Sequence, residues 1–328
     1  MCALFRSGIA EQVKVEMSNQ FPLVSVAIPL YKSLRFLDII IANIKAIDYP
    51  NVEIIISDRH CADNAIEILE ERFKEDARCK FYKATDQINW PEHYNLLLQL
   101  ATGQYFCWMP HDDSYPADYI SKLVTCLEEN PETLLAYGKM QTIDLNSQQI
   151  ENNFLHELPV GVNDPWTMLV AINLLAFQHL ETAFRGVFRR EAVIGAQHFI
   201  RPTGRTVGCD TYWLFGLALL GRLQYVPSCN CRKRFYGDST HVIQWSPQPE
   251  LQRIIDGMKV SNSYIRDYVP NCREAWLGYS LIFLYSLVRF ASMCARSLGI
   301  SRKWRRAVHR SIKSLFFRRD RTNLTVKA

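Results

Sequence analysis

The chain has 328 residues, of which 48% are hydrophobic and 22% are charged, so it can bury a large core in one or two domains. This composition is that of a globular protein, and it excludes a disordered chain or a fibre. The formal net charge of +5 is modest, and most of the surplus lies after residue 300. A basic end of this kind suits nucleic acid, anionic lipid or solubility alone.

The ten cysteines are scattered, and none forms a Cys-x-x-Cys pair. The only close pair, Cys229 and Cys231, has a spacing that suits neither a zinc site nor a redox motif. We therefore expect free thiols in a reducing cytosol. Residues 1–22 contain no apolar stretch as long as a secretion signal, which favours a cytoplasmic location.

Strands and helices alternate over about the first 145 residues. The apolar spacing predicts strands at 23–29, 52–58, 79–83, 104–110 and 134–142, separated by helices at 34–47, 65–73, 92–101 and 119–129. This alternation predicts βαβ units, and hence an α/β fold with a doubly wound, mostly parallel sheet flanked by helices.

The second half of the chain is less regular, and helical periodicity takes over from about residue 245 onward. The elements expected before that point are a loop at 151–164, helices at 165–177 and 211–220, a strand leading into a helix at 184–191, and strands at 223–227 and 231–236.

Polar turns follow three of the predicted strands. The dinucleotide motif G-x-G-x-x-G and the P-loop are both absent. Instead the strands end in Pro29-Leu30-Tyr31, Ser57-Asp58-Arg59 and His111-Asp112-Asp113. Because ligands of open α/β sheets lie at the carboxyl ends of the strands, we expect these turns to form one edge at which a nucleotide can bind.

Two adjacent carboxylates, Asp112 and Asp113, close the most apolar of these strands. Neighbouring carboxylates repel each other, and a bound divalent cation relieves that repulsion. The alternative is that Asp113 caps the helix that begins near residue 119.

The ordered set of these motifs resembles the family 2 glycosyltransferases, which have the GT-A fold and use nucleotide-sugar donors. The resemblance covers residues 23–241 and implies a GT-A domain at 23–245, between a lead at 1–22 and a helical, basic extension at 246–328. It departs from the family at Ser57-Asp58-Arg59-His60, His111-Asp112-Asp113 and Cys209-Asp210. The residues that carry it are Val24-Ser25-Val26-Ala27-Ile28-Pro29-Leu30-Tyr31, Ile55-Ile56-Ser57-Asp58, Asp63, Trp90, Asn95, Ala101-Thr102-Gly103-Gln104-Tyr105-Phe106-Cys107-Trp108, His111-Asp112-Asp113, Gly186-Val187-Phe188-Arg189-Arg190, Cys209-Asp210, Gly221, Val226-Pro227 and Arg234.

This resemblance implies a metal-dependent, hexosyltransferase-type enzyme that inverts the sugar it transfers. The donor is expected to be a UDP-sugar, and the acceptor a hydroxyl group in polysaccharide or glycolipid synthesis. Asp113, with His241, would hold Mn²⁺ or Mg²⁺, and Asp210 would act as the general base. Asp210 could also cap the helix after it, and a lone histidine such as His241 is often a surface residue.

The nucleotide contacts implied by the resemblance involve five residues. Tyr31 would stack on the base beside the backbone of Pro29, and Asp58 would accept a hydrogen bond from the base. Asp112 would contact the ribose, and Arg234 would recognise phosphate. Tyr31 could instead be a half-buried strand-end aromatic, and Asp58 could form an Asx turn.

The C-terminal region suggests a second partner. The apolar run at 276–288 is shorter than the ~20 residues needed to cross a bilayer. Residues 302–319 interleave basic and apolar side chains, which is typical of a helix that lies on an anionic membrane surface. We therefore expect peripheral binding to the inner face of the plasma membrane, with packing on the catalytic domain as the alternative.

Two other classes of function compete with a glycosyltransferase. A non-catalytic relative that binds sugar nucleotides would also explain the motifs, and it is the main alternative because Ser57, His111 and Cys209 replace common family residues. A nucleic-acid-binding protein would explain only the basic tail, since no binding module accompanies it, so nucleic acid is not an expected partner.

Overall fold

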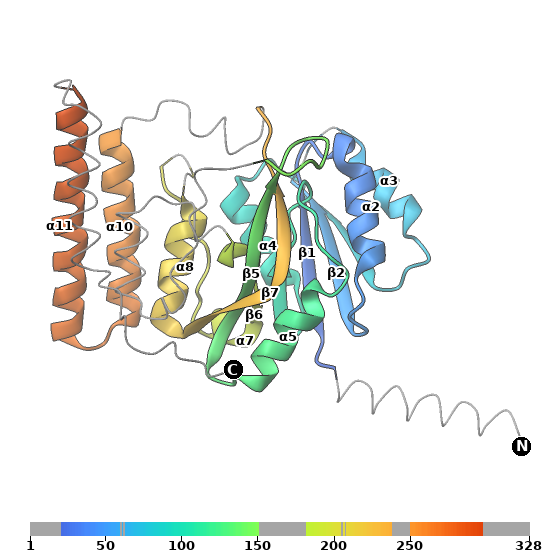
Figure 1. The fold of residues 1–328 in the computed structure, drawn as a ribbon, viewed down its shortest axis with the longest axis horizontal. Coiled ribbons are helices and arrows are strands. Elements are labelled where there is room, and N and C mark those ends of the chain that lie inside the picture. The colour runs from blue at the N-terminus through green and yellow to red at the C-terminus, as the bar shows by residue number, and fades with distance from the viewer. Residues whose placement is uncertain are drawn as a thin grey trace, which may run out of the picture.

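The computed structural model describes residues 21–59, 61, 63–150, 182–204, 206, 208–237 and 250–297. In these ranges the chain forms a seven-stranded sheet with the strand order β3-β2-β1-β4-β6-β5-β7 (Figure 1). The strands are β1 (Val24–Leu30), β2 (Val52–Asp58), β3 (Cys79–Lys83), β4 (Tyr105–Trp108), β5 (Thr133–Ile143), β6 (Val187–Arg189) and β7 (Arg222–Arg234).

Helices cover both faces of this sheet (Figure 1). They are α2 (Leu37–Ala46), α3 (Ala65–Arg72), α4 (Trp90–Leu100), α5 (Tyr119–Glu129), α7 (Arg190–Gly195), α8 (Cys209–Leu220), α10 (Glu250–Tyr268) and α11 (Cys272–Ser297), with short 3₁₀ helices η1 (Leu34–Phe36) and η2 (Ala183–Arg185). The predicted α/β class and mostly parallel sheet are therefore confirmed.

The central strands are buried on both faces. Every residue of β1, β2 and β4 is buried, which explains their continuous apolar runs. One face packs against α2, α3 and α5 through residues such as Ile40, Leu69 and Leu123. The other face packs against α4 and α8, where Trp108 and Trp213 meet with their ring centroids 5.0 Å apart.

Strand directions bring distant segments to one edge of the sheet. Strands β1, β2, β3 and β4 run parallel, and β6 runs antiparallel to both β4 and β5. Strand β7 is parallel to β5. The carboxyl ends of β1, β2, β4, β5 and β7 therefore lie at the same edge as the amino end of β6, and this edge is where the site is built.

The two strands predicted at 223–227 and 231–236 are one continuous strand, β7. Its pairing with β5 is irregular: Tyr137 pairs with Tyr225, but Lys139 already pairs with Asn230. Pro227 lies in the extra stretch, where the absence of a backbone N–H disrupts the ladder. Gly138 faces this bulge, and a Cβ there would lie 2.4 Å from the carbonyl oxygen of Cys229.

The appended helical region is confirmed for residues 250–297. Helix α10 packs on α8 through residues such as Tyr264, and α11 is the outermost helix (Figure 1). Within the described ranges, none of the helices combines the length and the apolar character that crossing a membrane requires. The elements predicted at 151–164, 165–177 and 302–319 lie outside the described residues.

Candidate active site

The turn that carries Asp112 and Asp113 is fixed on both sides. After β4, the backbone N–H of Met109 still donates to the carbonyl of Ala27 in β1. Two backbone hydrogen bonds, each 2.9 Å long, then join Ser114 to Arg232 of β7. The pair of acids is therefore held between the strand that precedes it and a strand more than a hundred residues later.

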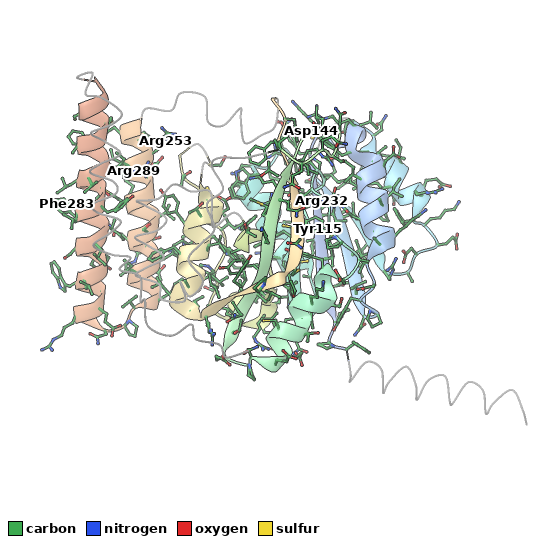
Figure 2. All side chains as sticks on the ribbon, in the orientation of Figure 1. Tyr115, Asp144, Arg232, Arg253, Phe283 and Arg289 are labelled. Carbon is green, nitrogen blue, oxygen red and sulfur yellow. The ribbon has the colours of Figure 1, made fainter. Side chains whose placement is uncertain are left out.

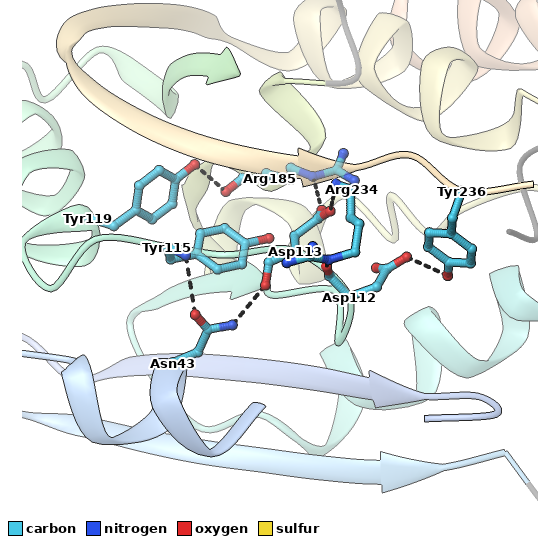
Figure 3. A network of polar contacts seen from close by, with 8 residues as sticks. All are labelled: Asn43, Asp112, Asp113, Tyr115, Tyr119, Arg185, Arg234 and Tyr236. Carbon is cyan, nitrogen blue, oxygen red and sulfur yellow. Dashed lines mark hydrogen bonds and ion pairs between the residues drawn. The ribbon is translucent and has the colours of Figure 1, made fainter. Parts of the chain in front are cut away.

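Asp113 is a buried ion-pair partner (Figure 3). Its side chain is 1% exposed, and Oδ2 accepts a hydrogen bond of 2.6 Å from Nε of Arg185, which is itself buried. Its Oδ1 accepts from the backbone N–H of Arg234 at 2.9 Å. Helix α5 begins after Asp118, so Asp113 does not cap it. Both carboxylate oxygens of Asp113 are thus already bound to protein donors.

Asp112 differs from its neighbour because it is only half-buried. Its Oδ2 accepts a hydrogen bond of 2.8 Å from the hydroxyl of Tyr236 (Figure 3). Its other carboxylate oxygen accepts no hydrogen bond from the described residues. The exposed guanidinium of Arg35 lies 4.6 Å from the ring centroid of Tyr236, so a positive charge packs on the tyrosine that binds this acid. Asp112 is the acid of the pair that remains open to a ligand.

Arg234 serves the protein scaffold. Its side chain is buried, and its guanidinium donates four hydrogen bonds, which go to the carbonyl oxygens of Asp112, Asp144 and Leu145 and to the hydroxyl of Ser147. An arginine has five N–H donors, so little of this group remains for phosphate. Its observed role is to tie the turn after β5 to the turn after β4.

The wall predicted for the base lies at the ends of β1 and β2. The guanidinium of Arg59 lies 3.5 Å from the ring centroid of Tyr31, so one face of that ring is already stacked. Asp58 is buried, and its Oδ2 accepts from the backbone N–H of Cys61 at 2.7 Å, which is the turn contact weighed as the alternative role. Tyr31 and Asp58 therefore lie at the same edge of the sheet as the pair of acids, and both are partly engaged with the chain itself.

Two histidines contact the strands that form this wall. Nδ1 of His111 lies 3.0 Å from the carbonyl oxygen of Pro29, so it carries the hydrogen and donates it. The ring of His93 lies 3.0 Å from the hydroxyl of Ser57. Burial and the nearby charge of Arg59 lower the pKa of His93 to about 3, so this ring is neutral at physiological pH.

Asp210 lies in the first turn of α8, just after Gly208 at its N-cap. It is partly exposed, and the positive end of the helix dipole favours its carboxylate form. Burial raises its pKa, which contacts from Thr211 and the charge of Arg185 offset only in part. A carboxylate with a raised pKa is a stronger proton acceptor than an ordinary aspartate.

Arg185 connects the two halves of the site. Burial raises the pKa of Asp113, of Asp210 and of Tyr94 in α4, and the charge of Arg185 lowers each of these pKa values in part. Asp113 and Asp210, which are 97 positions apart in the sequence, thus share one neighbourhood. The structure therefore places Pro29, Tyr31, Asp58, Asp112, Asp113 and Arg234 at one edge of the sheet, and Asp210 within reach of the charge of Arg185. His241 lies outside the described residues.

Four residues of the site were missed by the sequence analysis: Arg35, Tyr94, Arg185 and Tyr236. Arg185 stands in a stretch predicted as a strand, but it closes η2 immediately before β6. Because β6 is antiparallel, its amino end points to the site, and only that reversal places Arg185 beside Asp113. In contrast, Asn95 of α4 has a structural role, because it exchanges two hydrogen bonds with the backbone of Ile200.

Residues 25–192, about half of the chain, match the sequence model of the family described as Glycosyl transferase family 2. The chain belongs to this family. An uncharacterized glycosyltransferase of Haemophilus influenzae is 34% identical over 109 residues, which are 33% of this chain and 34% of that protein. The putative teichuronic acid biosynthesis glycosyltransferase TuaG of Bacillus subtilis is 26% identical over 113 residues, 34% of this chain and 45% of TuaG. The matches thus span about a third to a half of these relatives.

Two solved structures share the fold of this family 2 chain. TarS 1–349 of S. aureus in complex with UDP-GlcNAc has a TM-score of 0.62 and 14% identity, over 85% of this chain and 76% of that one. The mannosyltransferase PcManGT of Pyrobaculum calidifontis, in complex with GDP-Man and Mn²⁺, has a TM-score of 0.53 and 16% identity, over 90% and 87%. The expected GT-A fold is thereby confirmed.

Proposed function

We propose that this family 2 chain transfers a sugar from a nucleotide-diphosphate donor to a hydroxyl acceptor, with inversion at the anomeric carbon. The observation that carries the proposal is that Asp112 and Asp113 follow β4 at the edge where β1, β2 and β4 end, and that Arg185, which is paired with Asp113, is close enough for its charge to act on Asp210. Ligands of open α/β sheets bind at this edge. The position of the acids therefore agrees with the family membership.

The donor would bind along the ends of β1 and β2. Tyr31 and the backbone of Pro29 would flank the base, and Asp58 would accept a hydrogen bond from it. The half-buried Asp112 would meet the ribose and diphosphate. We propose a UDP-sugar carrying a hexose as the donor, with GDP-mannose as the contrasting case, because the two structural neighbours are complexed with UDP-GlcNAc and GDP-Man.

The acids fit a divalent cation only in part. Asp113 was expected to hold it, but this arrangement does not support that prediction, because both oxygens of Asp113 are bound to protein donors. Asp112 fits better, since one of its oxygens accepts no hydrogen bond from the described residues. Cations such as Mg²⁺ are often held by one or two carboxylates together with substrate phosphates. When bound there by Asp112, Mn²⁺ or Mg²⁺ would supply Lewis-acid stabilisation of the leaving diphosphate.

Asp210 would take the proton of the acceptor. As the acceptor oxygen forms its bond to the anomeric carbon, the bond between that carbon and the diphosphate oxygen breaks, and the nucleoside diphosphate leaves with the electron pair. The acceptor proton passes to the carboxylate of Asp210, whose raised pKa suits a general base. We propose that the acceptor belongs to a cell-surface polysaccharide or a glycolipid, in line with the role printed for TuaG.

A non-catalytic sugar-nucleotide-binding protein remains the second candidate. The observation that favours it is that the carboxylate of Asp113 and the guanidinium of Arg234 are already hydrogen-bonded to other groups of the chain. Such a protein would bind a nucleotide sugar without turning it over. Turnover therefore separates the two candidates, whereas binding does not.

The test is hydrolysis of UDP-glucose, UDP-galactose, UDP-GlcNAc and GDP-mannose by the full chain with Mn²⁺. We expect metal-dependent release of nucleotide from one of these donors, and a fall of at least about 100-fold in Asp210→Asn, which keeps the shape but removes the base. The matched control is Asp76→Asn, which alters a carboxylate paired with Arg78 at the opposite edge of the sheet. Binding without turnover in the wild-type chain, or full turnover in Asp210→Asn, would reject the assignment.

A further inference from the structure

Helix α11 (Cys272–Ser297) has one covered side and one open side. Its covered side packs on α10 through buried residues such as Ile282 and Tyr285. In Figure 1 it is the outermost described element, separated from the sheet by α10 and α8. Figure 2 shows Arg289 between the two helices and Phe283 on the side of α11 that faces away from α10. The open side therefore looks away from the catalytic sheet.

The open side is apolar, and we call it the outer face of α11. Six large hydrophobic side chains on it are between 43% and 72% exposed: Trp276, Leu277, Phe283, Leu284, Leu287 and Phe290. Their spacings of three, four and seven residues place them along one stripe of the helix. At 1.5 Å per residue, the stripe from Trp276 to Phe290 is about 21 Å long. A contiguous apolar patch of this kind marks an interaction surface.

Most of the charged residues before and after this patch in the sequence are basic. Arg273 precedes it, and the single acid of α11, Glu274, lies in the first turn at its border. Beyond the helix the sequence carries nine basic residues between 302 and 321, with Asp320 as the only acid among them. A partner with an apolar layer and negative charge would satisfy both features at once.

We propose that the outer face of α11 lies flat in the surface of an anionic membrane. Aromatic and leucine side chains would enter the boundary between headgroups and acyl chains. The basic residues that precede and follow them in the sequence would meet anionic lipid headgroups. No described helix is long and apolar enough to span a bilayer, so the face lies on the membrane and does not cross it.

A second copy of the chain fits the outer face less well. Two identical chains would also bury the apolar stripe, but each carries a formal net charge of +5, so neither would bring net negative charge to the other. A segment from residues 302–321 of the same chain would bring more positive charge to a face that already borders Arg273. The observed charges thus favour anionic lipid over either protein partner.

The test is flotation of the full chain with vesicles. We expect it to float with phosphatidylcholine vesicles that contain one third phosphatidylglycerol, and to remain in solution with phosphatidylcholine alone. In the double variant Phe283→Ser and Leu287→Ser, partitioning into the anionic vesicles should fall about 100-fold or more, because two large apolar side chains no longer insert. The matched control, Ile68→Ser on α3, removes a side chain that is 43% exposed elsewhere, and should partition like the wild type.

Three outcomes would overturn the proposal. One is equal flotation of the double variant and the wild type. Another is a wild-type dimer in sedimentation equilibrium that the double variant abolishes, with no flotation of either chain, which would assign the face to a second copy. The third is a face that neither binds vesicles nor mediates dimers. Donor hydrolysis in solution is measured alongside and should be unchanged in the double variant, so this test is independent of the proposed reaction.

Discussion

The neighbouring carboxylates Asp112 and Asp113 have separate tasks because their surroundings differ. Asp113 neutralises the buried guanidinium of Arg185 at 2.6 Å. Asp112 is half-buried and, among the described residues, its carboxylate accepts one hydrogen bond, from the hydroxyl of Tyr236. A buried charge needs its counter-charge far more than a half-exposed one does. At the scale of the residue, Asp113 therefore holds the scaffold, and Asp112 is the acid that remains open to the proposed donor.

This division predicts different effects for two similar substitutions. Asp113→Asn should lower the free energy of unfolding by about 3–5 kcal/mol, because it leaves Arg185 buried without its counter-charge. Asp112→Asn should lower it by less than about 1 kcal/mol, since an amide oxygen can still accept from Tyr236. Urea unfolding of both variants measures these values. Equal losses of stability would contradict the division of roles.

The Asp112→Asn variant also separates the stability of the fold from donor binding. In the presence of Mn²⁺, Asp112→Asn should weaken donor binding about tenfold or more while the fold remains intact. The Tyr236→Phe variant serves as the control, because it removes the hydrogen bond to Asp112 and keeps the carboxylate. If Asp112→Asn bound the donor as tightly as the wild type, Asp112 would not be the metal ligand, and Asp113 would again be the candidate.

At the scale of the element, the docking of α10 on α8 depends on a glycine. Gly216 lies in the middle of α8, and a Cβ there would come within 2.5 Å of His198 Cε1 and 2.7 Å of Tyr264 Cδ1. His198 itself bridges the two helices, because its ring nitrogens lie 2.8 Å from the carbonyl oxygen of Trp213 and 3.0 Å from the hydroxyl of Tyr268. The absence of a side chain at Gly216 is what allows this close packing.

We therefore predict that Gly216→Ala destabilises the protein by about 1–3 kcal/mol through overpacking, despite the better helix propensity of alanine. Gly195→Ala is the matched control, since a Cβ on Gly195 would meet no heavy atom within 4 Å, and it should be neutral or slightly stabilising. Thermal unfolding of both variants measures the difference. A Gly216→Ala protein as stable as the wild type would show that α10 can shift away without cost.

At the scale of the whole molecule, three buried groups predict acid sensitivity. Burial, which dominates in each case, lowers the pKa of His93 and of His198 to about 3. Burial alone would raise the pKa of Glu53, but hydrogen bonds from Lys80, Ser25 and Thr102 outweigh it and lower this pKa to about 2. In the unfolded chain these groups titrate near 6.5 and 4.5, so that chain binds more protons in acid.

The contribution of these three groups to the free energy of unfolding should therefore be greatest above about pH 7 and should fall as the pH is lowered. Between about pH 6 and 4.5 the two histidines give a slope of up to about 2.7 kcal/mol per pH unit. Below about pH 4.5 the protonation of Glu53 adds a further loss of stability, which is complete when the pH reaches about 2. Urea unfolding between pH 8 and 3 measures the slope, and Glu53→Gln should flatten only the part below about pH 4.5. A stability that is independent of pH over this range would contradict the account.

The sequence predicts those features of the molecule that local patterns encode. Runs such as Val24–Leu30 and Val52–Asp58 are apolar because they are buried on both faces, so the strands, their order along the chain and the turns at their ends could be predicted. The contacts of the site could not. Arg185 pairs with Asp113, 72 positions away in the sequence, only because β6 runs antiparallel to β4, and no local pattern predicts that direction. Arg234 binds the backbone of Asp144, 90 positions away.

The central claim is that a nucleotide sugar binds where β1, β2 and β4 end, with Asp112 and Asp210 on either side of its reacting bond. The most direct test is a crystal structure of the full chain with UDP-GlcNAc and Mn²⁺, or with GDP-mannose if that donor is the one hydrolysed. We expect the base beside Tyr31 and Asp58, the diphosphate beside Asp112, and the sugar facing Asp210. A nucleotide bound at another edge of the sheet, or a sugar that faces away from Asp210, would contradict the account.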